Sequence, residues 1–391
     1  MSGEKPENSN QKENNPVKKY FLLLILSLWI QRISAQDNIT PETVTILSST
    51  VNESSGLLNL DDTIWTHNDS GGYPALYQVS THDGSIIRTV TILNATNVDW
   101  EDLAFDSNYV YIGDFGNNSG SRTDLKIYRI SRAALVIGDA VPADIINFSY
   151  NDQTSWVPNP NQTDFDCEAF IAYHDSLFLF SKNWVDHKTR MYQLSNQPGT
   201  HVAQYQSTFD AQGLITAAEM LPNNVLVLQG YTSTLSPFTL LFQQFTGNVF
   251  FDGTPTRLTW PGITQTEGVC FADTNGVFVS SEKLPPPFNF PATLFYLDLS
   301  GYYINPPPSG IVKTEPQFTI YSDPLNIYVK SRYRMVVPAT IRIVNSIGQV
   351  IKTVNDFLGT EIRIPVTFDK GIYLVTIHTR RSDYSGKIII H

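Results

Sequence analysis

Between Glu42 and about Tyr303 the chain is a succession of short apolar runs separated by turn residues, which is the pattern of β-strands. The runs recur in cycles. Each cycle opens with an acidic residue before an apolar strand, continues with two further apolar strands and ends with a more polar one. The opening residues are Glu53, Glu101, Glu168, Glu219 and Glu267. Repeats of roughly fifty residues built from short strands predict a β-propeller.

The fifth cycle lacks its fourth strand. The segment TVTIL at Thr43–Leu47 has no cycle of its own, and it resembles TVTIL at 89–93 inside the first cycle. We predict that it supplies the missing strand, so that the two ends of the domain close one blade and no sheet edge stays open. The fold predicted is all-β, with a five-bladed propeller over 36–305. A sixth blade hidden in the insert between Tyr128 and Asp164 is the alternative.

Polar residues lie at the positions in each predicted blade that should form the rim of the propeller's central channel. Because the first two strands of a blade are antiparallel, the start of the first lies beside the end of the second. The candidate metal ligands there are Glu53, Glu101, Glu168, Glu219, Glu267 and Glu282. The candidate ligand-binding residues are His67, Asn68, Asp69, Trp100, Asp114, Asn183 and Trp184.

Carboxylate and amide oxygens suit a hard cation such as Ca²⁺. The same groups form hydrogen bonds to the hydroxyls of a sugar or lactone, on which tryptophan rings stack. The alternative is structural: the glutamates bind backbone amides of the neighbouring blade, and the strand-end polar residues form turns.

The N-terminal residues 1–35 have the organisation of a signal peptide. A polar lead ending in Lys18 and Lys19 precedes the apolar run Tyr20–Ile30, and Ile33-Ser34-Ala35 offers a cleavage site. The run is shorter than the roughly twenty residues needed to span a bilayer. Export through the general secretory route is therefore expected, with an uncleaved anchor as the alternative.

Composition narrows the possible partners. The 391 residues include 26 basic and 37 acidic ones, a net charge of −11, which argues against a nucleic-acid binder. Cys167 and Cys270 lie in apolar strand-like runs, so buried free thiols are favoured over a disulfide between distant blades. We expect a monomer.

The composition changes again after the proline-rich segment 306–316, which reads as a linker. Residues 317–391 contain several alternating strands, as in a small Ig-like β-sandwich. This unit resembles the type IX secretion C-terminal sorting domains of Bacteroidetes. The resemblance rests on Tyr321-Ser322-Asp323-Pro324, on the segments 343–349 and 371–375, and on Gly386-Lys387-Ile388-Ile389-Ile390.

That family usually has asparagine where this chain has Asp323. The resemblance implies recognition by the type IX secretion machinery, passage across the outer membrane, removal of the domain, and release or anchoring at the cell surface. A carbohydrate-binding sandwich is the alternative.

Two further resemblances concern the repeat region. The segments WTHNDSGG at 65–72, DWEDLA at 99–104 and YIGDFGNN at 111–118 are similar to a family of uncharacterised secreted bacterial propeller-like proteins. The dipeptide Glu267-Gly268 is similar to the calcium-dependent gluconolactonase and senescence-marker propellers, whose glutamate is a metal ligand.

These observations predict a secreted or cell-surface propeller that binds an extracellular ligand, a carbohydrate or a protein, without chemistry of its own. The alternative is a Ca²⁺-dependent hydrolase of the lactonase or phosphoesterase kind. Its metal would polarise a carbonyl or phosphoryl oxygen, and a carboxylate or His67 would act as the base. No nucleophile-elbow, phosphate-loop or zinc-protease motif supports it.

Overall fold

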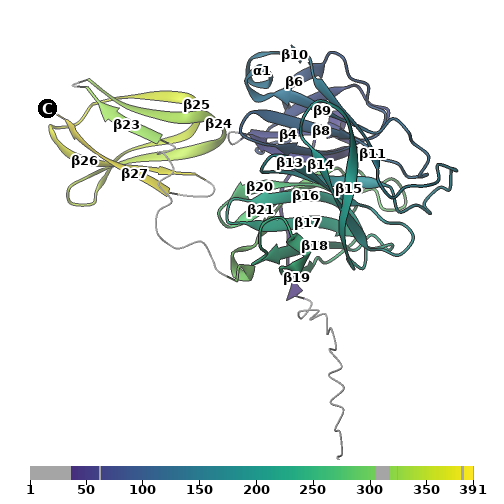
Figure 1. Cartoon of the computed structure of the whole chain (residues 1–391). Helices are drawn as coiled ribbons and strands as arrows, with labels where there is room; N and C mark the ends of the chain where they lie inside the picture. The colour runs from purple at the N-terminus through teal and green to yellow at the C-terminus, as the bar shows by residue number, and fades with distance from the viewer. Residues whose placement is uncertain (1–36, 61–62, 305–317, 324, 380–382, 391) are drawn as a thin grey trace, which may run out of the picture. The chain divides into compact units, whose positions relative to one another are not determined.

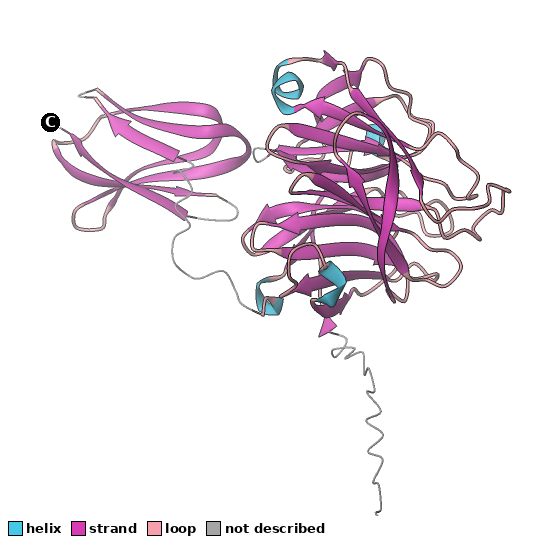
Figure 2. Cartoon of the chain, in the orientation of Figure 1, coloured by secondary structure: helices cyan, strands magenta, loops and turns pink. Residues whose placement is uncertain are grey.

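The computed structural model describes residues 37–60, 63–304, 318–323, 325–379 and 383–390. The predicted signal peptide, 1–35, and the predicted linker, 306–316, lie outside these residues. In the described ranges β-strands dominate, with one short α-helix and a few 3₁₀ turns (Figures 1 and 2). Among the described residues, no helix combines the length and apolar character needed to cross a membrane.

Five blades of antiparallel strands follow one another along the chain. Blade 1 holds β3 (Ser54–Leu60), β4 (Thr63–Asn68), β5 (Ala75–Val79) and β6 (Ile86–Ile92). Blade 2 holds β7 (Trp100–Phe105), β8 (Tyr109–Asp114), β9 (Lys126–Ser131) and β11 (Asp144–Tyr150). The chain between its last two strands forms α1 (Arg132–Ile137) and β10 (Ala140–Val141), and β10 pairs in parallel with β6 of blade 1. Blade 3 holds β12 (Cys167–Tyr173), β13 (Ser176–Ser181), β14 (Thr189–Ser195) and β15 (Gly199–Phe209).

Blade 4 holds β16 (Leu214–Leu221), β17 (Val225–Tyr231), β18 (Pro237–Gln243) and β19 (Thr254–Thr259), and the short β1 (Asp37–Asn38) pairs with β19. Blade 5 holds β20 (Thr266–Asp273), β21 (Gly276–Ser281) and β22 (Thr293–Asp298). Its fourth strand is β2 (Glu42–Ile46), which is antiparallel to β22. The predicted closure of the propeller by the TVTIL segment is thus confirmed.

The hydrophobic core lies between the blades. Each pair of adjacent blades encloses its own apolar cluster, including the pair formed by blades 5 and 1. An inner strand such as β13 is therefore buried on both faces, which explains why it reads as a continuous apolar run. The first strands of the blades are neighbours of one another in a ring around the central axis. Cys167 and Cys270 are free and buried, as predicted.

Blades 2 and 3 are joined in a way that the strand pattern did not predict. Their outer strands β11 and β15 pair in parallel, Ile146 to Tyr150 against Gly199 to Ala203, so the two blades form one eight-stranded sheet. The rest of the insert, 151–166, contains no strand. The alternative of a sixth blade is therefore not supported.

The C-terminal unit is a small β-sandwich. It contains β23 (Phe318–Ser322), β24 (Asn326–Asn345), β25 (Val350–Pro365), β26 (Gly371–His378) and β27 (Asp383–Ile390). All neighbouring strands are antiparallel, and the long β24 pairs with β23, β25 and β26. Alternate residues of these strands enclose one apolar core of aliphatic and aromatic side chains.

Candidate binding site at the channel mouth

The first strand of every blade carries a β-bulge near its start. The pairing of the first and second strands slips after Ser54, Trp100, Cys167, Ile215 and Thr266. A bulge inserts an extra residue into one strand and re-aims its side chain. The residues in the bulges include Ser55, Glu101, Glu168, Thr216 and Glu267, one from each blade.

Two of these positions carry hydroxyls that are satisfied inside the protein. The Ser55 hydroxyl donates to the backbone carbonyl of Glu101, and Thr216 Oγ1 donates to the Thr266 carbonyl at 2.6 Å. Both acceptors belong to the next blade of the ring. The other three positions carry glutamates, and these line a cavity of about 480 Å³.

The bulges correct two of the predicted rim residues. Glu53 is exposed and lies two residues before the bulge residue Ser55. Glu219 pairs with Val227, far along β16 from the bulge at Thr216, and accepts a hydrogen bond from the Phe271 backbone. The acidic residue used to mark the fourth cycle is thus not equivalent to Glu101, Glu168 and Glu267.

The cavity is lined mainly by polar side chains from blades 2 to 5 and by one loop of blade 1. Its lining residues are Asp69, Glu101, Asn118, Asn161, Glu168, Lys182, Trp184, His187, Leu214, Tyr231, Ser233, Leu235, Gln265 and Glu267. Asp102, the residue after Glu101, closes the centre of the ring, because its Oδ2 accepts from the backbone of Phe170 at 3.1 Å and of Ala218 at 3.2 Å.

Lys182 is the buried cation of this cavity. Its Nζ lies 2.5 Å from Glu168 Oε2, and both side chains are less than a tenth exposed. Its ammonium also lies over the rings of Trp184, at 5.2 Å, and Tyr231, at 5.4 Å. Burial opposes its charge, but the surrounding carboxylates, Glu168 first, hold the pKa of Lys182 above its ordinary value.

A second group of carboxylates forms no ion pair within the part of the chain that the structure describes. Oxygens of Asp69, Asp99 and Glu101 all lie within 4.8 Å of one another. Burial, reinforced by the neighbouring carboxylates, raises the pKa of Asp99 to about 7 and that of Glu101 well above its usual range. Burial also raises the pKa of Asp69 to about 6, although Lys182 acts in the opposite direction.

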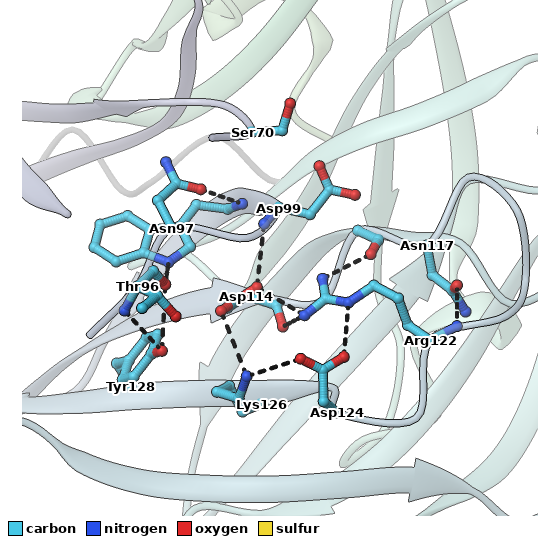
Figure 3. Close-up of polar contacts among 12 residues, drawn as sticks. Ser70, Thr96, Asn97, Asp99, Asp114, Asn117, Arg122, Asp124, Lys126 and Tyr128 are labelled. Atoms are coloured by element: carbon cyan, nitrogen blue, oxygen red, sulfur yellow. Dashed lines mark hydrogen bonds and ion pairs between the residues drawn. The ribbon is translucent and has the colours of Figure 1, made fainter. Parts of the chain in front are cut away.

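Asp114 stands behind this group and is neutralised by blade 2 itself (Figure 3). Its Oδ1 accepts from Arg122 Nη2 at 2.9 Å, and Lys126 Nζ lies 3.8 Å from Oδ2. Asp124 holds both cations from the other side. The Asp99 backbone donates to Asp114 Oδ1 at 3.2 Å, while its carboxylate points away from this network. Asp114 is therefore a support for Asp99 and does not line the cavity.

Some of the remaining predicted ligand-binding residues line the cavity, and others are enclosed in the core. Asp69 and Trp184 line the cavity. His67 and Trp100 are fully buried and pack edge to face, with ring centroids 5.5 Å apart. Burial lowers the pKa of His67 to about 4, so this histidine is neutral and enclosed between blades 1 and 2.

The side chains of Asn68 and Asn183 form hydrogen bonds to backbone groups near them and do not line the cavity. Asn68 Oδ1 accepts from the Glu53 backbone at 3.3 Å, and Asn183 Oδ1 accepts from the Val185 backbone at 2.9 Å. Glu282 lies next to the cavity rather than in its wall, because Gln265 Nε2 donates to both Glu282 and Glu267 at 2.8 Å.

Leu214, Tyr231 and His187 were not among the predicted site residues. Leu214 and Tyr231 pair at the start of blade 4, at the place that the strand pattern assigned to Glu219. The sequence does carry a signal for Leu214 and Tyr231: Tyr231 is the last residue of the second strand, VLVLQGY, and Leu214 lies opposite it in the first strand. His187 lies in the β13–β14 loop, which carries no strand pattern.

Comparison with known proteins concerns mainly the C-terminal unit. Residues 320–391 match the family model of the secretion system C-terminal sorting domain. This unit carries the sorting domain of the type IX secretion system. The sorting domain implies interaction with the type IX secretion machinery, export, and a secreted or cell-surface location. The search of curated proteins finds no match.

Solved structures of similar architecture include two enzymes. An exo-β-1,3-galactanase from Phanerochaete chrysosporium is 10% identical, with a TM-score of 0.42, over 90% of this chain and 99% of that chain. A xylan β-1,4-xylosidase from Bacillus halodurans is 9% identical, with a TM-score of 0.40, over 88% of this chain and 92% of that chain. Likeness at this level bears on neither activity nor ligand.

Proposed function

We propose that this exported protein is a binding module whose propeller holds a saccharide in the cavity at the channel mouth. The observation that carries the proposal is one cavity that combines buried carboxylates, a buried ammonium and an aromatic ring, on a protein with a secretion sorting domain. A volume of about 480 Å³ lies within the roughly 300–1,000 Å³ typical of small-molecule sites.

The chemistry of the wall suits a ligand rich in hydroxyls. Glu168 and Glu267 accept hydrogen bonds, and Lys182 donates them. Trp184 offers an indole ring that is held in place by a hydrogen bond of 2.7 Å from its Nε1 to Asp166 Oδ2. A fixed ring beside charged hydrogen-bonding groups matches the apolar faces and polar edges of a sugar.

The first experiment measures saccharide binding by the purified full chain on an array of glycans and polysaccharides. Replacing Trp184 with alanine removes the aromatic wall, and we expect affinity for any bound saccharide to fall about tenfold, or 1.4 kcal/mol. Trp156→Ala is the matched control, because Trp156 is 43% exposed in the loop 151–166 and does not line the cavity. Failure to bind any saccharide, or equal losses in both variants, would contradict the proposal.

A metal-dependent hydrolase is the second candidate, and one observation favours it. Burial raises the pKa of Glu267 to about 7, against the opposing effect of Lys182, which suits a general acid or base near neutral pH. Glu267 lines the cavity together with the other glutamates. The full chain should then hydrolyse a lactone or phosphoester, with a pH–rate limb near 7.

Glu267→Gln would abolish this turnover while leaving saccharide binding measurable. Its control is Glu282→Gln, the neighbouring carboxylate outside the cavity wall. Absence of turnover across lactone and phosphoester panels, with Ca²⁺ present, would eliminate the second candidate and leave the first intact.

A further inference from the structure

We propose that Asp69, Asp99 and Glu101 form a binding site for one divalent cation of the Ca²⁺ type, on the side of the cavity between blades 1 and 2. Asp69 follows β4, Asp99 precedes β7, and Glu101 is the bulge residue of β7. The site requires no saccharide.

The spacing of the oxygens fits a single ion. One oxygen from each carboxylate can be chosen so that all three lie within 4.8 Å of one another. Ca²⁺ binds oxygen at about 2.3–2.6 Å, so two ligands on opposite sides of one ion are about 5 Å apart at most. Three carboxylates also match the preference of Ca²⁺ for charged oxygen ligands, and the open side toward the cavity leaves room for further oxygens.

The second observation is an unpartnered buried carboxylate. Glu101 is only 4% exposed, and among the described residues no donor forms a hydrogen bond to its side chain. The side chain lines the cavity. A charged carboxylate in such a place is costly unless it is paired with a cation or protonated.

The backbone confines this carboxylate from behind. A Cβ at Gly116 would lie 1.9 Å from Glu101 Oε1 and 2.5 Å from Asp99 Oδ2. Only glycine allows the chain to approach both carboxylates so closely, and it leaves the cavity as their open side.

The protein's own cations near the site are already engaged. Lys182 contacts Glu168, and Arg122 contacts Asp114 and Asp124. When ionised, the three carboxylates of the proposed site repel one another, because their oxygens lie within 4.8 Å. An external cation would remove this repulsion.

The loops that carry the ligands are held before any ion binds. Asn97 Nδ2 donates to the backbone carbonyls of Asn68 at 3.0 Å and Asp69 at 2.6 Å, which fixes the loop after β4. Asp99 is fixed through its backbone, whose N–H donates to Asp114 (Figure 3). The backbone carbonyl of Asp99 accepts from the Gly116 N–H at 3.2 Å. Such support keeps ligands in place and makes binding less costly in entropy.

The test is a titration of the metal-free full chain with Ca²⁺ and, separately, with Mg²⁺, by calorimetry and thermal unfolding. We expect one Ca²⁺ to bind and to raise the melting temperature. Asp99→Asn should weaken Ca²⁺ binding about tenfold or more, as loss of a ligand or its support does. Glu219→Gln is the matched control, because Glu219 is a buried carboxyl outside the site, and this variant should bind Ca²⁺ like the wild type.

Glu101→Gln gives a second, independent readout. In chelator this variant should melt at a higher temperature than the wild type, because a repelling charge is gone, while its shift on adding Ca²⁺ should shrink. Absence of binding by the wild type at millimolar Ca²⁺ and Mg²⁺ would overturn the proposal. So would wild-type affinity in both Asp99→Asn and Glu101→Gln. Because no saccharide is present, these outcomes are separate from those that test saccharide binding.

Discussion

The bulges of blades 1 and 4 differ from those of blades 2, 3 and 5 in what they carry. All five occupy the same place in their blades. Ser55 and Thr216 donate to the backbone of the next blade, whereas Glu101, Glu168 and Glu267 face the cavity. The bulge residues with hydroxyls therefore connect neighbouring blades, and the bulge residues that are glutamates line the cavity. A repeat position in a propeller can thus be structural in one blade and functional in the next.

The largest expected effect comes from breaking the ion pair of a glutamate position. Lys182→Met leaves the Glu168 carboxylate buried without its cation, and we expect a loss of about 3–5 kcal/mol of unfolding free energy at neutral pH. Urea unfolding monitored by tryptophan fluorescence measures it. The double variant Lys182→Met with Glu168→Gln should recover most of the loss, and no recovery would show that Lys182 acts through packing alone.

Glu219 is a buried glutamate that does not lie on a bulge, so it shows what burial alone does to a glutamate in this protein. Burial raises the pKa of this carboxyl from its usual 4.5 to about 8, against the hydrogen bond from the Phe271 backbone. The folded state then holds a proton that the unfolded state releases between these values, so stability falls as pH rises from about 4.5 to 8.

Between pH 5 and pH 7 this contribution amounts to about 2–3 kcal/mol. In Glu219→Gln the free energy of unfolding should fall by that much less over the same pH range, as measured by urea unfolding at a series of pH values. Identical pH profiles for the two proteins would place the pKa of Glu219 near its ordinary value. Asp102, the buried carboxyl that interacts with Glu219, is the same residue in both proteins.

The smallest effect concerns a hydroxyl position. Thr216→Val keeps the side-chain shape but leaves the buried Thr266 carbonyl without its donor, so we expect a loss of about 1–2 kcal/mol. Cavity ligands should bind unchanged. Thr208→Val, on the exposed strand β15, is the control and should change stability by less than about 0.5 kcal/mol. Weakened ligand binding in Thr216→Val would show that the hydroxyl positions, like the glutamate positions, contribute to the cavity.

The site was only partly predictable. Glu101, Glu168 and Glu267 were found because an acidic residue preceding an apolar run is visible in the sequence. Glu219 was selected by the same rule and was misplaced, because the mostly apolar residues LITAA before it already belong to β16. The pairing of Lys182 with Glu168 and the convergence of Asp69 with Asp99 involve residues from different strands or blades, and strand periodicity carries no information about such contacts.

The order of the strands and the closing strand were determined by the sequence alone, because both depend on hydrophobic runs whose period is local. The sequence left five and six blades open, and the pairing of β11 with β15 decided for five. The sorting domain was recognised from sequence motifs within it, among them the segments 343–349 and 371–375. Which polar side chains meet was decided only by the tertiary structure. A β-bulge adds one residue and turns the next side chain to another face, while leaving the hydrophobic pattern almost unchanged. The five bulges therefore decided which glutamates reach the cavity.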